Sequence, residues 1–156
     1  MRTRGFTLIE LVVTLAIVAL LASAAMPLAN LVATREKEAE LRAALRDIRG
    51  AIDAYRTATQ TGHIRLEVGA TGYPPDLKSL YIGVEDAASE KKLNMYFLRR
   101  IPRNPFFPDS TAPAEETWGL RSYASPPDDP QAGDDVFDVY TLASGNGLNG
   151  VPYHDW

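Results

Sequence analysis

Residues 5–34 read GFTLIELVVTLAIVALLASAAMPLANLVAT, and the 24 residues from Leu11 to Thr34 carry no charged side chain. As a helix, this run would be about 36 Å long, enough to cross a hydrocarbon core of roughly 30 Å. Arg2 and Arg4 precede it. Positive charge before a membrane span favours a cytoplasmic N-terminus, with the rest of the chain exported. The sequence therefore predicts one membrane-inserted helix near the N-terminus.

Three kinds of N-terminal segment share this outline. They are a secretory signal peptide cut near Ala22-Ser23-Ala24, a plain transmembrane anchor, and a leader cut before the apolar run. Glu10 favours the third, because an unpaired carboxylate inside an apolar segment costs a few kcal/mol and marks a functional residue. The apolar run also continues past Ala24 to Ala33, which cleavage at Ala24 would leave exposed.

The string Gly5-Phe6-Thr7-Leu8-Ile9-Glu10 resembles the type III signal of type IV pilins and type II secretion pseudopilins. The resemblance implies that a prepilin peptidase cuts between Gly5 and Phe6 and methylates the new N-terminal residue. It also implies that Glu10 pairs with the N-terminal amine of a neighbouring subunit during assembly. Pro27 lies where many family members have a proline, and we expect it to kink or loosen the helix.

Residues 35–62 favour an amphipathic stalk helix that continues the membrane segment. One apolar stripe at 4-3-4-3 spacing runs along it, made of Leu41, Leu45, Ile48, Ile52 and Tyr55. Gly62 is a candidate C-cap. The turns before the stripe carry Glu36, Lys37, Glu38 and Glu40. We interpret them as a solvated neck; the alternative is that they pair with Arg42, Arg46 or Arg49 of adjacent subunits.

The remaining residues predict short elements that cover the stripe. Asp76 can cap a short helix through Leu80, and residues 87–100 have a helical pattern in which Leu93, Tyr96 and Phe97 face alike. Residues 117–124 and 136–142 alternate as strands do, with a turn region rich in proline and aspartate between them. We expect an α+β, pilin-like fold: one long N-terminal helix, half membrane-spanning and half amphipathic, packed against a small C-terminal antiparallel sheet.

The corresponding organisation is a leader at 1–5, a transmembrane and assembly helix at 6–34, a stalk helix at 35–62 and a periplasmic globular domain at 63–156. Several landmarks in this domain resemble the major pseudopilin of type II secretion, and the absence of cysteine agrees with this, since many type IV pilins close their C-terminal region with a disulfide. The landmarks are Tyr73-Pro74, Ile101–Phe106, Trp118–Tyr123, Phe137–Tyr140 and Trp156.

Pseudopilins of this kind have a calcium loop with several aspartates before the C-terminal tryptophan. Residues 144–156 here offer only Asp155 as a carboxylate, while Asn146 and Asn149 could offer side-chain amide oxygens as ligands. Ca²⁺ takes six to eight oxygen ligands and usually more than one charge, so we favour a loop held by glycine turns and aromatic packing over a calcium site. The aspartates at 128, 129, 134 and 135 are a second metal candidate; we favour a solvated acidic loop.

No catalytic constellation is evident from the sequence, and we expect no enzyme and no cofactor. His63 is interpreted as a surface residue. The net charge is −4, and the C-terminal residues 104–156 carry nine acidic side chains against one arginine; this argues against nucleic acid as a partner.

The resemblance implies a single-pass inner-membrane protein with a periplasmic soluble domain, assembled into a periplasmic pseudopilus that drives type II secretion. The implied partners are further copies of the chain, minor pseudopilins, prepilin peptidase and the inner-membrane assembly platform. One alternative is a type IV pilin used for adhesion, motility or DNA uptake. The other is a membrane-tethered periplasmic binding protein or enzyme.

Overall fold

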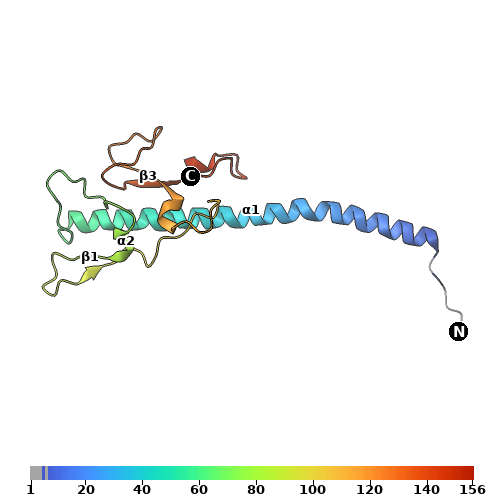
Figure 1. Cartoon of the computed structure of the whole chain (residues 1–156), viewed down its shortest axis with the longest axis horizontal. Coiled ribbons are helices and arrows are strands. Elements are labelled where there is room, and N and C mark those ends of the chain that lie inside the picture. The colour runs from blue at the N-terminus through green and yellow to red at the C-terminus, as the bar shows by residue number, and fades with distance from the viewer. Residues whose placement is uncertain (1–4, 6) are drawn as a thin grey trace. The chain divides into compact units, whose positions relative to one another are not determined.

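The structure, a computed structural model, describes residue 5 and residues 7–156. It divides into two compact units, Met1–Lys37 and Glu38–Trp156. The long helix α1, Leu8–Gln60, contributes residues to both units (Figure 1). The remaining elements all belong to the second unit, so the expected combination of a long N-terminal helix and small C-terminal sheets is confirmed.

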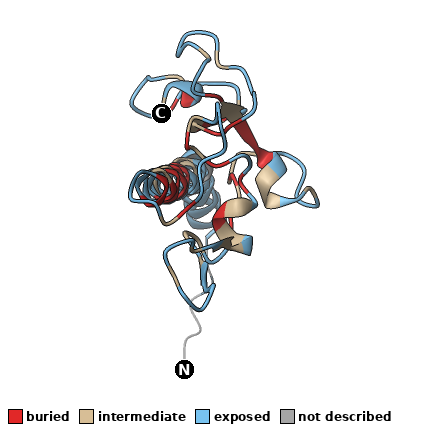
Figure 2. Ribbon diagram, turned by 90° about the vertical axis from the view of Figure 1, so that its left-hand side faces the viewer, coloured by how far each residue is buried: buried red, intermediate tan, exposed pale blue. Residues whose placement is uncertain are grey.

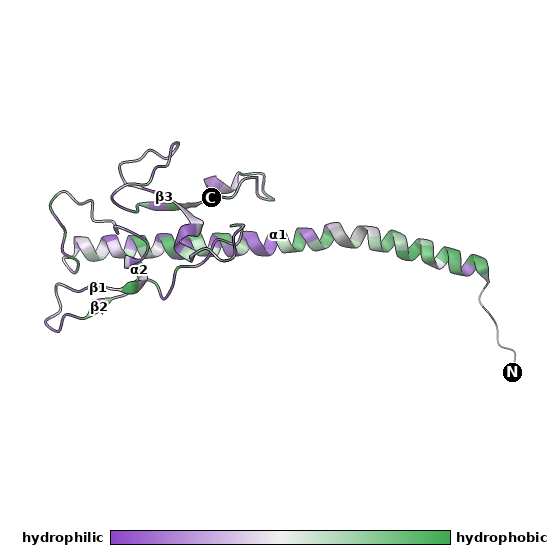
Figure 3. Ribbon diagram, in the orientation of Figure 1, coloured by the Kyte–Doolittle hydropathy of each residue, from purple (hydrophilic) through white to green (hydrophobic). Residues whose placement is uncertain are grey.

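In the first unit, α1 presents an apolar surface without internal cover. Its large hydrophobic side chains from Leu8 to Leu28 that the structure describes, and that of Val32, are exposed, between 47% and 82%, whereas Leu31 is half-buried. Figure 3 shows the hydrophobic colour along this part of the helix and mixed colours further along it. By length and composition this helix can cross a membrane.

In the second unit, the predicted stripe of α1 forms the core. Leu41, Leu45, Ile48 and Ile52 are each at most 2% exposed, and Tyr55 is 7% exposed. Ala44, Ala51 and Ala58, which are 3–5% exposed, widen the stripe. Figure 2 shows the buried residues on this part of α1 and on the segments around it. The periodicity therefore identified the buried face correctly.

The C-terminal end of α1 has the geometry predicted for Gly62. Gly62 has a φ of 81°, a conformation that only glycine adopts readily. Its amide donates to the Thr59 carbonyl at 3.2 Å, and the His63 amide donates to the Ala58 carbonyl at 2.9 Å. This pair of bonds is a Schellman motif, which satisfies carbonyls that the helix end would leave free.

The segment after α1 differs from the prediction. Helix α2 is short, Ser79–Ile82, and Asp76 Oδ1 accepts a hydrogen bond from the Ser79 amide at 2.8 Å. The helix expected over residues 87–100 is wrong: strands β1, Val84–Glu85, and β2, Asn94–Met95, pair there as an antiparallel hairpin.

The physical reason for this difference is that distant residues take up the backbone groups of the segment. Ala87 donates its amide to the His63 carbonyl at 2.7 Å, and the Phe97 and Leu98 amides donate to the Leu80 carbonyl at 2.9 and 2.8 Å. These tertiary bonds replace those of a helix.

The two predicted C-terminal strands are confirmed. Strand β3, Trp118–Arg121, pairs antiparallel with β4, Asp138–Thr141. The register places Gly119 opposite Tyr140, and an added Cβ at Gly119 would lie 2.4 Å from the Tyr140 ring. Short 3-10 helices precede β3, Ala114–Thr117, and end the chain, Tyr153–Asp155.

A buried amide joins the sheet to the loop before it. Asn104 is 1% exposed. Its Nδ2 donates to the Thr117 carbonyl at 3.2 Å and to Thr141 Oγ1 at 2.7 Å, and its Oδ1 accepts from the Phe106 amide at 3.0 Å. Buried polar groups are tolerated when they are bonded in this way, so Asn104 fixes the position of the loop against both strands.

Candidate functional site

Glu10, the residue predicted to register assembly, lies in the first turn of α1. Its Oε2 accepts hydrogen bonds from the Thr7 amide and from Thr7 Oγ1, both at 2.8 Å. The Glu10 amide donates to Thr7 Oγ1 at 3.3 Å. This reciprocal arrangement is a capping box, which satisfies amides at a helix start. The Thr-x-x-Glu pattern that signals it was overlooked in the sequence.

The remaining processing and helix residues have simpler surroundings. Gly5 is exposed, and Phe6 lies outside the described residues. Pro27 lies inside α1, which is helical on both sides of it. The hydroxyls of Thr14 and Ser23 donate to the carbonyls of Leu11 and Leu20 at 3.0 and 2.7 Å. Such bonds keep polar side chains satisfied on an apolar helix.

The solvated neck predicted before Leu41 is wrong for Glu38. Its side chain is buried, because residues from the end of the chain cover it: Glu38 Oε1 accepts from the Leu148 amide at 2.7 Å and from the Tyr153 hydroxyl at 3.2 Å. Arg42 Nη2 lies 3.7 Å from Glu38 Oε2 within the same chain. The partners come from more than 100 residues away, so no local pattern reveals them.

The three candidate metal ligands near the C-terminus each make a different contact within the chain. Asn149 Oδ1 accepts from the Val151 amide at 3.1 Å and shapes a turn. Asp155 Oδ1 lies 2.9 Å from His154 Nε2. Asn146 forms an antiparallel bridge with Pro152 through its backbone. Across the described part of the chain, no group of three or more histidine, cysteine, aspartate or glutamate side chains is arranged to hold a metal ion.

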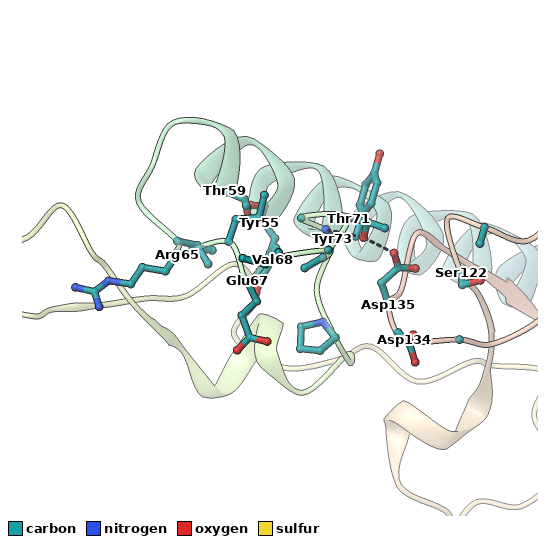
Figure 4. A pocket seen from close by; sticks show the side chains of 18 residues that line it. Tyr55, Thr59, Arg65, Glu67, Val68, Thr71, Tyr73, Ser122, Asp134 and Asp135 are labelled. Carbon is teal, nitrogen blue, oxygen red and sulfur yellow. Dashed lines mark hydrogen bonds between the residues drawn. The ribbon is translucent and has the colours of Figure 1, made fainter.

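A cavity of about 630 Å³ lies between the loop after α1 and the acidic turn region. In Figure 4, Thr71 and Asp135 meet at its edge, where Thr71 Oγ1 donates to Asp135 Oδ2. Asp135 Oδ1 accepts from the Tyr123 amide at 2.8 Å, and Asp135 is 8% exposed. Asp135 is therefore a buried link between two loops, which corrects its interpretation as solvated, whereas Asp128, Asp129 and Asp134 are exposed as expected.

The two histidines each contact a single carboxylate. His63 Nδ1 lies 2.9 Å from Asp86 Oδ1, and its side chain is 42% exposed. This hydrogen bond lowers the pKa of Asp86 below its ordinary value. His63 is thus at the surface but has a partner, and the bond ties the end of α1 to the β1–β2 hairpin.

Comparison with known families gives a match at the N-terminus. Residues 1–26 match the family described as "Prokaryotic N-terminal methylation motif". Neither the comparison with curated proteins nor that with solved structures gives a match. The motif covers Gly5, Phe6 and Glu10 and implies processing by prepilin peptidase and pilus-like assembly. The chain therefore carries, at the start of an α+β fold with one long apolar N-terminal helix, the prepilin-type signal of type IV pilin-like proteins.

Proposed function

We propose that this chain is a structural subunit that polymerises into a periplasmic pseudopilus and so drives protein export by type II secretion. The observation that carries the proposal is a single carboxylate, Glu10, in the first turn of an apolar helix that follows a prepilin-type signal. After cleavage, Phe6 would carry a positive amine. A carboxylate and an amine that are each costly to leave alone in lipid stabilise one another when two subunits meet.

The geometry at Glu10 supports a role between subunits. Thr7 bonds only to Oε2, and Oε1 accepts no hydrogen bond from the part of the chain that the structure describes. One oxygen therefore holds the start of the helix while the other stays open to the amine of a neighbour. The methyl group added to that amine leaves its positive charge in place.

Packing in the second unit supports the narrower assignment to pseudopilins. The two landmark stretches, Ile101–Phe106 and Trp118–Tyr123, are separated in sequence but meet in space. Trp118 Nε1 donates to the Pro102 carbonyl at 2.9 Å, and Trp118 is 3% exposed. The lack of cysteine favours a pseudopilin over the alternative, a type IV pilin for adhesion, motility or DNA uptake. A tethered binding protein or enzyme would explain only the anchor.

Glu10→Gln tests the proposal, because glutamine keeps a carbonyl oxygen for the Thr7 bonds but cannot neutralise an amine. Intact-mass analysis should show N-methylated Phe6 at the start of both wild type and variant. Sheared filaments and exported protein should be lost in the variant. Thr14→Val, which removes another polar group from the same helix, should leave all three readouts unchanged. Normal filaments from Glu10→Gln would contradict the proposal, and a mature chain that starts at Ala25 would indicate a secretory signal instead.

The choice between pseudopilus and pilus needs a second measurement. Deletion of the gene should abolish export of periplasmic intermediates to the medium and leave twitching motility and DNA uptake intact. The reverse result would assign the chain to a type IV pilus.

A further inference from the structure

The C-terminal loop, residues 144–156, closes on itself through its backbone. The Gly147 amide donates to the Val151 carbonyl at 2.8 Å, and the Tyr153 amide donates to the Gly145 carbonyl at 3.1 Å. Gly145 and Gly150 have φ values of 105° and 80°, which glycine adopts at little cost. These bonds give the loop its shape, but they do not attach it to the rest of the unit.

Glu38 makes the first attachment of the loop to α1. Its side chain is 5% exposed, and its Oε1 accepts from the amide of Leu148 and the hydroxyl of Tyr153. Burial, followed by the hydrogen bond to Glu38, raises the pKa of Tyr153, which keeps its hydroxyl protonated as a donor. One carboxylate therefore joins two points of the loop to the helix.

Two arginines of α1 make the second attachment. The Arg42 guanidinium lies 4.0 Å from the centre of the Trp156 ring, a cation–π geometry. About two helical turns further along, Arg49 Nη2 donates to the Trp156 carbonyl at 2.8 Å and to the Val139 carbonyl at 3.1 Å. The loop is thus held at its middle by Glu38 and at its end by Arg42 and Arg49.

The donor set in this loop does not fit the calcium ion that the pseudopilin resemblance implies. Asn149 Oδ1 already accepts from Val151, and Asp155 is paired with His154. The nearest buried carboxylate, Glu38, already accepts two bonds through one oxygen and faces Arg42 with the other. The Arg42 guanidinium, with Nη2 3.7 Å from Glu38 Oε2, would repel a divalent cation bound there. A carboxylate that already accepts hydrogen bonds from protein donors is also a poor ligand for Ca²⁺.

We propose that Glu38 acts as the positioning residue of the C-terminal loop, so that an anion on the helix holds the loop in place of the bound cation that the pseudopilin resemblance implies. The negative charge is on α1 and the donors are on the loop, the reverse of a calcium loop, in which carboxylates converge on a metal. The position of the loop should therefore be independent of Ca²⁺ and dependent on the charge of Glu38. This holds whether the filament is a pseudopilus or a pilus.

The experiment is hydrogen–deuterium exchange with mass spectrometry on the full chain in detergent micelles, with millimolar Ca²⁺ or with excess EDTA. In wild type, peptides from residues 144–156 should exchange at the same rate in both buffers. Glu38→Gln keeps the shape of the side chain and removes its charge. Because hydrogen bonds to a charged group contribute about 1.5–3 kcal/mol, exchange in the loop should become about tenfold faster or more. Glu40→Gln, an exposed neighbour on the same helix, is the matched control and should leave exchange unchanged.

Peptides from β3 serve as an internal reference, because they report unfolding of the whole unit. If Glu38→Gln accelerates β3 as much as the loop, Tyr153→Phe decides, since it removes one donor and keeps the ring. Faster exchange confined to the loop in Tyr153→Phe then supports the proposal, and unchanged exchange contradicts it. Exchange in the wild-type loop that Ca²⁺ slows tenfold and EDTA restores would overturn it, as would a Glu38→Gln loop that exchanges like wild type.

Discussion

Arg49 on α1 donates a hydrogen bond from Nε to Asp138 Oδ1 on β4 at 2.7 Å, across 89 residues of sequence. The same guanidinium reaches two backbone carbonyls through Nη2, at Val139 and Trp156. Asp138 also lies 3.7 Å from Arg121 Nη2 on β3. A single side chain of the helix therefore connects the sheet and the chain end to the core, on the face beside the apolar stripe.

Removal of these bonds should destabilise the second unit. The Arg49 side chain is 38% exposed, so solvent screens the ion pair and its contribution is small; the two carbonyl bonds bring the expected loss for Arg49→Met to about 2 kcal/mol of unfolding free energy. Urea unfolding monitored by tryptophan fluorescence measures it. Arg46→Met, at an exposed position of the same helix, should change the unfolding free energy little. Equal losses in both variants would mean that the arginine contributes through helix propensity alone.

Two glycines of one helix should respond to alanine in opposite directions. Gly50 lies inside α1 with nothing within 4 Å of an added Cβ, so Gly50→Ala should stabilise the unit by about 0.5–1 kcal/mol through reduced backbone freedom in the unfolded chain. Gly62 has a φ of 81°, where a Cβ is strained, so Gly62→Ala should destabilise it by about 1 kcal/mol. Thermal unfolding of the two variants provides the comparison. A stabilising Gly62→Ala would show that the helix does not end in a Schellman motif.

A fragment that begins at Thr34 should be soluble, folded and monomeric, because the second compact unit begins at Glu38 and its core begins at Leu41. A fragment that begins at Leu41 keeps the whole stripe but lacks Glu38. The Leu148 amide and the Tyr153 hydroxyl then lose their acceptor, and we expect a loss of about 1–3 kcal/mol in unfolding free energy. Calorimetry should show one cooperative transition for the longer fragment; a broad, non-cooperative melt would show that the sheet and loops do not cover the stripe.

Acid should weaken the link between His63 and Asp86. The hydrogen bond from His63 lowers the pKa of Asp86 from its ordinary value of 3.8 in the folded state only. The stabilisation is therefore complete above pH 3.8 and is lost as the pH falls through the lower, folded value. A titration of the Asp86 side-chain carbon by NMR should give a midpoint below 3.8 in wild type and closer to it in His63→Ala. His154→Ala, remote from this pair in sequence, should leave the Asp86 midpoint unchanged; a shift there would indicate a general electrostatic effect.

Periodic elements of this fold could be predicted from the sequence. The stripe from Leu41 to Tyr55, the C-cap at Gly62 and the strand positions β3 and β4 all follow local rules of spacing and turn chemistry. These rules depend on neighbours a few residues away, which a sequence displays directly. The capping box of Thr7 and Glu10 is of the same kind and could have been identified.

Other features depend on partners far along the chain. The segment 87–100 has a helical pattern, but backbone groups at His63 and Leu80 take its hydrogen bonds. Glu38 and Asn104 are polar residues that only tertiary contacts bury. The calcium candidates were chosen by composition, whereas the observed bonds of Asn149 and Asp155 are made within the loop. Hydrogen bonds between residues far apart in sequence are the feature of the site that the local sequence pattern could not reveal.

The residues of α1 after Lys37 form the core of the second unit. A fusion that keeps this unit intact must therefore be joined inside the helix and not at its end. A chimera joined at Gln60 would carry the strands and loops of the second unit without the apolar stripe of α1 against which they pack. A chimera joined between Lys37 and Glu38, with the helical phase kept, would carry a self-sufficient body onto a foreign anchor. A fused antigen or enzyme should likewise be joined away from the helix, at the exposed Asp128–Asp129 turn.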